Sequence, residues 1–293
     1  MPTLGIQQRL RLAINMHMPS KPKSAQRAHH GAETVARSDS FEWLARAGFI
    51  ARGLIYGIVG VLAVQLAAGV RGTTASQQGA MKAIAAQPFG WVLLILVAIG
   101  LGGYGIWRLT HALLGHGREG SDTSLERLAA LGSGIVYAGL CAVAVEIALG
   151  TDSSGSVGAQ KTTAGVFSWP AGTWLVGIAG AVLIGIGLYQ GYRGVSRDFL
   201  EDSKTEQMSA PVRQWIKWIG TIGHLARMVV FGLLGTFLIK AAVDYNSNTA
   251  VGLDGALAKL AHQSYGPFLL GLVAAGLLAF GLYSLSDARY RRI

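Results

Sequence analysis

A glycine-rich apolar stretch that occurs three times constrains this chain more than any other feature. The first copy, Ala45–Leu66, reads ARAGFIARGLIYGIVGVLAVQL. The second copy aligns Gly53 and Tyr56 with Gly134 and Tyr137. The third copy aligns Gly48, Arg52, Tyr56, Gly57 and Gly60 with Gly223, Arg227, Phe231, Gly232 and Gly235. Because a second apolar run follows each copy, the sequence predicts three tandem helical hairpins.

The length and composition of these runs are typical of membrane-spanning helices. A helix rises about 1.5 Å per residue, so about 20 residues cross a hydrocarbon core about 30 Å thick. Charged residues make up 14% of the chain, whereas soluble proteins have about 25%. We therefore expect an all-α integral membrane protein with six spans, at about 47–68, 90–111, 128–149, 172–193, 219–241 and 267–286.

The spans divide the chain into a basic tail and three repeats. Residues 1–40 are expected to form a cytoplasmic tail without fixed structure, or else a short amphipathic helix on the membrane surface. The repeats occupy 41–117, 123–200 and 209–293. Helix-start signals precede the first span of each repeat, where we expect a short interfacial helix: Asp39 with Glu42, Thr123 with Glu126, and Ser209 before Pro211.

The loop after the first span contains a second repeated motif. GAMKAIAAQ at 79–87 matches GALAKLAHQ at 255–263, which predicts a short helix in repeats 1 and 3. Repeat 2 has only TTAGVFSWP there, so we expect this element to be degraded or lost. The first spans of the three hairpins are expected to line the inner contact of a bundle with approximate threefold internal symmetry.

The positions of the basic residues predict the orientation. Most of the 25 lysines and arginines lie in the tail, between spans two and three, between spans four and five, and at the C-terminus. By the positive-inside rule, both termini are cytoplasmic, and we expect a multi-pass protein of the bacterial inner membrane. This distribution accounts for the net charge of +10, so no nucleic-acid partner is expected. All seven tryptophans, Trp107 included, are expected at the membrane interfaces.

The repeated pattern resembles a known bacterial membrane family, called domain of unknown function 1206. The resemblance runs from ARAGFIARGLIYGIVGVLA to QPFGWVLLILVAIGLGGYGIWRL in repeat 1 and extends over about residues 43–293. Repeat 2 departs most from the pattern, with Ser133 in place of the arginine. The resemblance implies three copies of a two-span unit and implies no activity.

Arg52 and Arg227 are candidate site residues because each lies within an apolar span. A charged side chain at the bilayer centre costs roughly 2.5–3.5 kcal/mol on insertion scales, and such residues often mark functional paths. Two interpretations stay open. Each arginine can reach back to the inner interface as a structural anchor, or the two can converge on one phosphate or carboxylate as an anion or lipid-headgroup site.

Other repeat-equivalent residues are expected to pack helices together rather than to bind a substrate. They are Gly53, Tyr56, Gly57, Tyr104, Gly134, Tyr137, Tyr189, Phe231, Gly232 and Tyr283. His111, His116 and His224 lie toward the inner face, but nothing fixes a pair that would ligate a haem. A single cysteine, Cys141, excludes a thiolate metal site. We predict no metal and no cofactor.

Three function classes follow from these observations. We favour a non-enzymatic structural or accessory protein that binds lipid of the bilayer, a membrane-protein partner or a second copy of itself. The alternative is a small transporter or channel whose path follows the pseudo-symmetry axis and favours anions through Arg52 and Arg227. A membrane enzyme is disfavoured because the sequence contains no recognisable catalytic motif.

Overall fold

The computed structural model describes residues 39–70, 72, 74–114, 124–150 and 155–292. The chain divides into two compact units, Met1–Phe41 and Glu42–Ile293, and the fold described here is that of the second. The tail predicted over 1–40 lies outside the described residues except for its last two, and His116 and Thr123 lie outside them as well.

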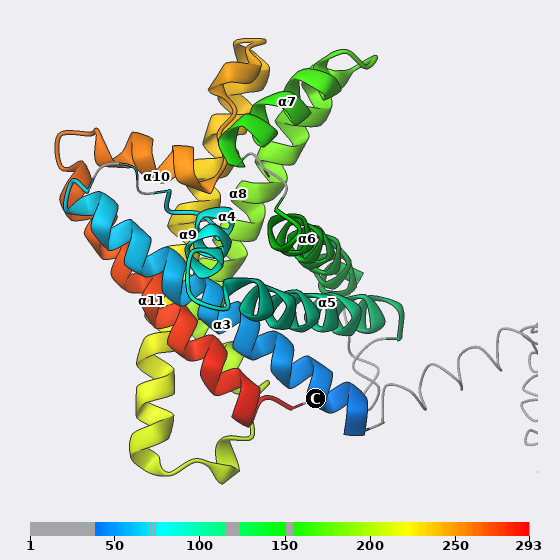
Figure 1. The fold of residues 1–293 in the computed structure, drawn as a ribbon, viewed down its shortest axis with the longest axis vertical. Coiled ribbons are helices and arrows are strands. Elements are labelled where there is room, and N and C mark those ends of the chain that lie inside the picture. Colours follow the sequence, from blue (N-terminus) through cyan, green and yellow to red (C-terminus); the bar gives the residue numbers. More distant parts are fainter. Residues whose placement is uncertain (1–38, 71, 73, 115–123, 151–154, 293) are drawn as a thin grey trace, which may run out of the picture. The chain divides into compact units, whose positions relative to one another are not determined.

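Six of the helices in the described ranges are long and apolar enough to cross a membrane, with mean hydropathies of 1.8 to 2.1 (Figure 1). They are α3 (Asp39–Ala67), α5 (Gly90–Leu114), α6 (Ser124–Ala148), α8 (Gly172–Ser196), α9 (Ala210–Val243) and α11 (Gly266–Tyr290). The part of the chain that the structure describes contains no named strand. The predicted all-α class is therefore confirmed for these residues, as are six helices that could cross a membrane.

The first helix of each repeat begins earlier than its predicted span. Helix α9 starts at Ala210, with Ser209 as its N-cap residue and Pro211 in its first turn, and runs without a break into the apolar segment. Helix α3 likewise continues unbroken from Asp39. The segment expected to lead into the span is thus continuous with it, because between Pro211 and Gly220 no proline or glycine interrupts the helix.

A short helix follows the first span in all three repeats. The expected helices of repeats 1 and 3 are α4 (Gln77–Ala85) and α10 (Leu253–Ala261). Repeat 2 forms α7 (Gly155–Phe167), so of the two alternatives, degraded or lost, the loss is wrong. The motif has diverged, but no proline interrupts the segment before Pro170, and α7 packs against α8. Short 3-10 helices complete the connections: η1 (Asp198–Leu200), η2 (Thr205–Gln207) and η3 (Ser247–Thr249).

Close packing at glycine joins the long helices. Helix α5 packs on α6 and α8 packs on α9. A Cβ atom added to Gly180 of α8 would lie 2.7 Å from the carbonyl oxygen of Gly235 in α9. A Cβ atom on Gly281 of α11 would lie 2.8 Å from the backbone nitrogen of Gly57 in α3. Small residues thus let helix backbones approach closely, which is how helices associate where lipid removes the hydrophobic drive.

The helices differ in how much of their apolar segment is buried. The buried share is 50% in both α3 and α5 and 56% in α11, but 22% in both α6 and α8 and 28% in α9. Helices α3 and α11 lie side by side in Figure 1, with α5 next to α3. The expectation that the three first spans line the inner contact is therefore wrong for α6 and α9, because two second spans, α5 and α11, pack more of their surface inside.

Trp107 also departs from expectation. Six tryptophans are between 55% and 77% exposed, but Trp107 is 2% exposed. Its ring packs edge-on against Phe49, with ring centres 5.2 Å apart, and is tilted against Tyr104 at 5.3 Å. Trp107 therefore belongs to the aromatic core between α3 and α5 rather than to an interface belt.

The contact of α11 with α3 predicts that Gly281→Ala destabilises the protein. The added methyl group would meet backbone atoms of α3, which cannot rotate away, so we expect a loss of about 1–3 kcal/mol in unfolding free energy. Unfolding in mixed detergent micelles measures the loss. Gly271→Ala is the matched control on the same helix, because nothing lies within 4 Å of its added methyl group. Equal stability of the two variants would contradict this close contact.

Candidate functional site: a buried ion pair and an arginine beside a cavity

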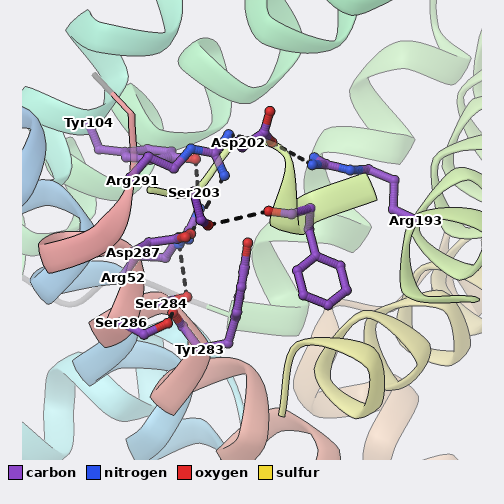
Figure 2. Close-up of polar contacts among 11 residues, drawn as sticks. Arg52, Tyr104, Arg193, Asp202, Ser203, Tyr283, Ser284, Ser286, Asp287 and Arg291 are labelled. Atoms are coloured by element: carbon purple, nitrogen blue, oxygen red, sulfur yellow. Dashed lines mark hydrogen bonds and ion pairs between the residues drawn. The ribbon is translucent and has the colours of Figure 1, made fainter. Parts of the chain in front are cut away.

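Arg52 lies inside the protein and joins three helices. Its side chain is 7% exposed, and Nη2 donates to Oδ2 of Asp287 in α11 at 2.8 Å. Nε donates to Oγ of Ser284, also in α11, at 3.0 Å, and Nη1 donates to the hydroxyl of Tyr104 in α5 at 2.7 Å (Figure 2). The guanidinium of Arg52 therefore binds α3 to both α5 and α11 through charge-assisted hydrogen bonds.

Aromatic rings surround this ion pair. The guanidinium carbon of Arg52 lies 4.9 Å from the ring centre of Phe49, 5.1 Å from that of Tyr104 and 5.3 Å from that of Phe280. These rings exclude water and present their negative faces to the cation. Burial of a charge is costly unless it is paired and hydrogen-bonded, and Arg52 meets both conditions.

The ion pair continues into a chain of alternating charges. Asp287 lies 3.8 Å from Nη1 of Arg291, and Nη2 of Arg291 lies 2.9 Å from Oδ2 of Asp202. The same oxygen of Asp202 accepts from Arg193 of α8 at 2.6 Å (Figure 2). Burial opposes the charge on Arg291, but Asp202 and Asp287 outweigh this effect and raise the pKa of Arg291 above its ordinary value. The network thus stays charged and links α3, α8, α11 and the segment between α8 and α9.

Backbone bonds attach the C-terminal residues to that same segment. Ser203 and Arg291 form an antiparallel bridge, and the amide of Lys204 donates to the carbonyl of Tyr290 at 2.7 Å. The amide of Arg292 donates to the carbonyl of Asp202 at 2.9 Å. The end of repeat 3 is therefore tied to the segment that follows repeat 2 as well as to the start of repeat 1.

Arg227 has different surroundings from Arg52. Its two Nη atoms donate to the side-chain oxygen of Gln190 at 3.0 and 3.1 Å, with the amide turned so that this oxygen faces the arginine. Its guanidinium lies 4.5 Å from the ring centre of Phe280 and 5.3 Å from that of Phe231. Its Nε atom is buried without a hydrogen-bond partner. Within the described ranges, no carboxylate forms an ion pair with Arg227.

A cavity of about 170 Å³ lies beside Arg227. Its walls come from α3, α9, α11 and the first residues of α4 and α10. They are Tyr56, Gln77, Arg227, Val230, Phe231, Leu234, Gly252, Leu253 and Leu277. Arg227 brings the only formal charge to a lining that is mostly apolar, so this cavity can accept a small ligand with one negative group.

The two candidate arginines do not bind a common group. Arg52 contacts Ser284, which follows Tyr283, and Arg227 contacts Gln190, which follows Tyr189, so their partners occupy equivalent repeat positions. Only Arg52 has an acid. Asp287 was missed as that partner, although it stands where repeats 1 and 2 have Arg108 and Arg193.

The remaining predicted residues have distinct environments. Tyr137 packs edge-on against Tyr104 with ring centres 4.4 Å apart, and Tyr56 packs against Phe280 at 4.8 Å. Tyr283 is 2% exposed, whereas Tyr189 is 39% exposed. Among the predicted glycines, an added Cβ on Gly53 would meet Leu285 of α11 and one on Gly134 would meet Leu109 of α5, but one on Gly57 or Gly232 would meet nothing within 4 Å.

The histidines do not gather around a metal. His224 is 4% exposed and sits among the rings of Phe199, Phe280 and Tyr283. Its two ring nitrogens have no hydrogen-bond partner. His111 packs against Trp107 with ring centres 4.5 Å apart. In the residues that the structure describes, no group of three or more histidine, cysteine, aspartate or glutamate side chains could hold a metal ion.

Comparison with known proteins shows the family. The family model described as Domain of Unknown Function (DUF1206) matches the chain three times, at residues 47–115, 128–197 and 222–291. The chain belongs to this family. A relative in the same comparison is the uncharacterized protein YxxB of Bacillus subtilis (strain 168), 33% identical over 251 residues, which cover 85% of this chain and 90% of that protein. No solved structure matches the chain significantly.

For this DUF1206 protein, the buried ion pair predicts a large effect of Asp287→Asn. The substitution leaves the charge of Arg52 buried without its acid, so we expect a loss of about 3–5 kcal/mol in unfolding free energy. Adding Arg52→Gln should recover part of that loss, which a double-mutant cycle in detergent measures.

The control is Glu206→Gln, because Glu206 forms an ion pair with Arg292 at 3.1 Å in which both side chains are more than half exposed. Stability should not change measurably in this variant. An Asp287→Asn protein as stable as Glu206→Gln would show that the buried pair does not hold α11 to α3.

Proposed function

We propose that the protein is a non-enzymatic, multi-pass protein of the bacterial inner membrane that acts as a structural or accessory component by binding lipid or a membrane partner. The observation that carries this proposal is the pairing of Arg52 with Asp287. The charge inside the first span is neutralised by the last helix of the same chain, surrounded by rings, and leaves no charged group there for a moving ion. Such an arrangement stabilises a fixed bundle.

The proposed architecture is three parallel two-helix units, over 41–117, 123–200 and 209–293, around a pseudo-threefold axis. It is supported by the helix pairs α5 with α6, α8 with α9 and α11 with α3. In each pair, the second long helix of one repeat packs on the first long helix of the next, and the third pair returns to the start. Parallel repeats related by an axis along the membrane normal would produce this cyclic order.

The proposed orientation places both termini in the cytoplasm. It is supported by the basic residues at one end of the long helices, among them Arg46, Arg193, Arg197 and Arg289. These residues flank apolar segments, where the positive-inside rule has its strongest effect.

Cysteine labelling tests this orientation. In a Cys141→Ser background, the variant Glu201→Cys, between α8 and α9, should resist a membrane-impermeant maleimide in intact spheroplasts. Asp244→Cys, at the other end of α9, should react, and both positions are exposed on the protein. Both cysteines should react after the membrane is permeabilised. Labelling of Glu201→Cys but not Asp244→Cys in intact spheroplasts would reverse the proposed orientation.

A transporter or channel is the second candidate function. The cavity beside Arg227 favours it, because a cation without an acid partner in a hollow between α3, α9 and α11 can attract an anion.

Reconstitution separates the two functions. For a structural or accessory protein, vesicles containing the purified chain should show no chloride or iodide flux above that of empty vesicles. Native mass spectrometry of the same preparation should show retained lipid or a protein partner. Anion flux that Arg227→Gln abolishes, with Arg213→Gln as the exposed control on the same helix, would establish the transporter instead.

A further inference from the structure

We infer that the cavity beside Arg227 is a binding site for the carboxylate group of a fatty-acid anion, with the guanidinium of Arg227 as its recognition element. The inference deepens the lipid-binding role proposed above and rests on it. It assigns different roles to the two arginines of the first spans, which the repeats place in equivalent positions.

The charge of Arg227 is the first feature that indicates an anionic ligand. An arginine side chain is always protonated in a protein and carries five N–H donors. Two nitrogens of Arg227 donate to the neutral side-chain oxygen of Gln190, and Nε has no partner. Arg52, by contrast, has the carboxylate of Asp287 at 2.8 Å. The charge of Arg227 is thus hydrogen-bonded but not neutralised, and an anion in the adjacent cavity would supply the missing charge.

The cavity lies between the middle of α9 and the beginnings of two short helices. Arg227 lies midway along α9, and the lining residues Val230 and Leu234 follow it one and two turns toward the C-terminal end of that helix. Gln77 and Leu253 complete the lining, and they are the first residues of α4 and α10. The N-terminal ends of two short helices thus border the cavity. Asp254, in the first turn of α10, is not part of the lining.

The side chains that line the cavity favour a carboxylate over a phosphate. Tyr56, Phe231, Val230, Leu234, Leu253 and Leu277 offer mainly apolar surface, and Gln77 is the second polar side chain after Arg227. A phosphomonoester carries a charge of about −1.5 to −2 and three strong acceptor oxygens, more than one guanidinium can satisfy here. A carboxylate carries one charge and matches a guanidinium in two parallel hydrogen bonds.

The volume of the cavity limits the size of the ligand. An engineered apolar cavity of roughly 150 Å³ holds a benzene molecule, and this cavity has about 170 Å³. A carboxylate with its first few methylene groups fits in that volume, with the polar end at Arg227 and the methylene groups against Val230, Leu234 and Leu277. A fatty-acid anion, and not a bare inorganic ion, therefore suits both ends of the cavity.

Calorimetric titration of the full-length protein in a non-ionic detergent tests the inference, with decanoate, decanol and inorganic phosphate as probes. Decanoate should bind at one saturable site. Arg227→Gln should weaken it at least about tenfold, the loss expected when a hydrogen-bonded charge pair is removed. Leu234→Phe should weaken it similarly by filling the cavity while Arg227 stays, and this variant decides the matter where Arg227→Gln fails to fold. Arg213→Gln, an exposed arginine on α9, should bind as the unaltered protein does.

Four results would overturn the inference. Decanol binding as tightly as decanoate would show that charge is not recognised. Decanoate binding that neither variant weakens would place the ligand elsewhere. Phosphate binding that depends on Arg227, without decanoate binding, would show a phosphoryl site. Absence of decanoate binding in a preparation that retains phospholipid and shows no ion flux would reject this inference and leave the proposed structural role standing.

Discussion

A guanidinium inside a bundle of apolar helices is tolerated only if an acid and further acceptors surround it, and this requirement organises the structure around Arg52. Asp287 provides the acid, and Ser284 and Tyr104 provide the remaining acceptors. Because these partners lie on α5 and α11, satisfying one side chain brings three helices together. The near-contact of Gly281 with the α3 backbone is the steric counterpart of the same requirement, since the pair can form only if α11 approaches α3 closely.

The second arginine within a first span shows how a repeated framework can acquire a specialised position. Arg227 also lies over aromatic rings, among them Phe231 and Phe280, and its partner occupies the repeat-equivalent position. That partner, however, is Gln190 instead of a serine and an acid, and a cavity lies beside the guanidinium. The structural ion pair and the proposed binding cavity are therefore two versions of one site. Phe280 lies beside both guanidinium groups, with its ring centre 5.3 Å from the guanidinium carbon of Arg52 and 4.5 Å from that of Arg227.

Sequence reasoning predicted the elements better than the contacts. Six apolar runs of the right length are enough to predict six helices, because hydrogen bonding in lipid leaves the backbone few alternatives. The short helix of repeat 2 was missed because its motif has diverged while its capacity to form a helix has not. Trp107 was misplaced because position near a span end does not distinguish a ring facing lipid from one facing Phe49.

The partner of Arg52 could not be deduced, because the pairing of α3 with α11 joins residues 235 positions apart. The sequence did contain a signal: Asp287 occupies an arginine position of the other repeats.

A cryo-EM structure of the full chain in a lipid nanodisc, with a bound antibody fragment to aid alignment, would show whether Arg52 pairs with Asp287 between α3 and α11. The quantity to measure is the separation between the guanidinium of Arg52 and the carboxylate of Asp287. The account predicts a hydrogen-bonded pair between α3 and α11, enclosed by Phe49, Tyr104 and Phe280, with no carboxylate of the chain at Arg227. Arg52 extended to the lipid headgroups, with α11 packed away from α3, would contradict it.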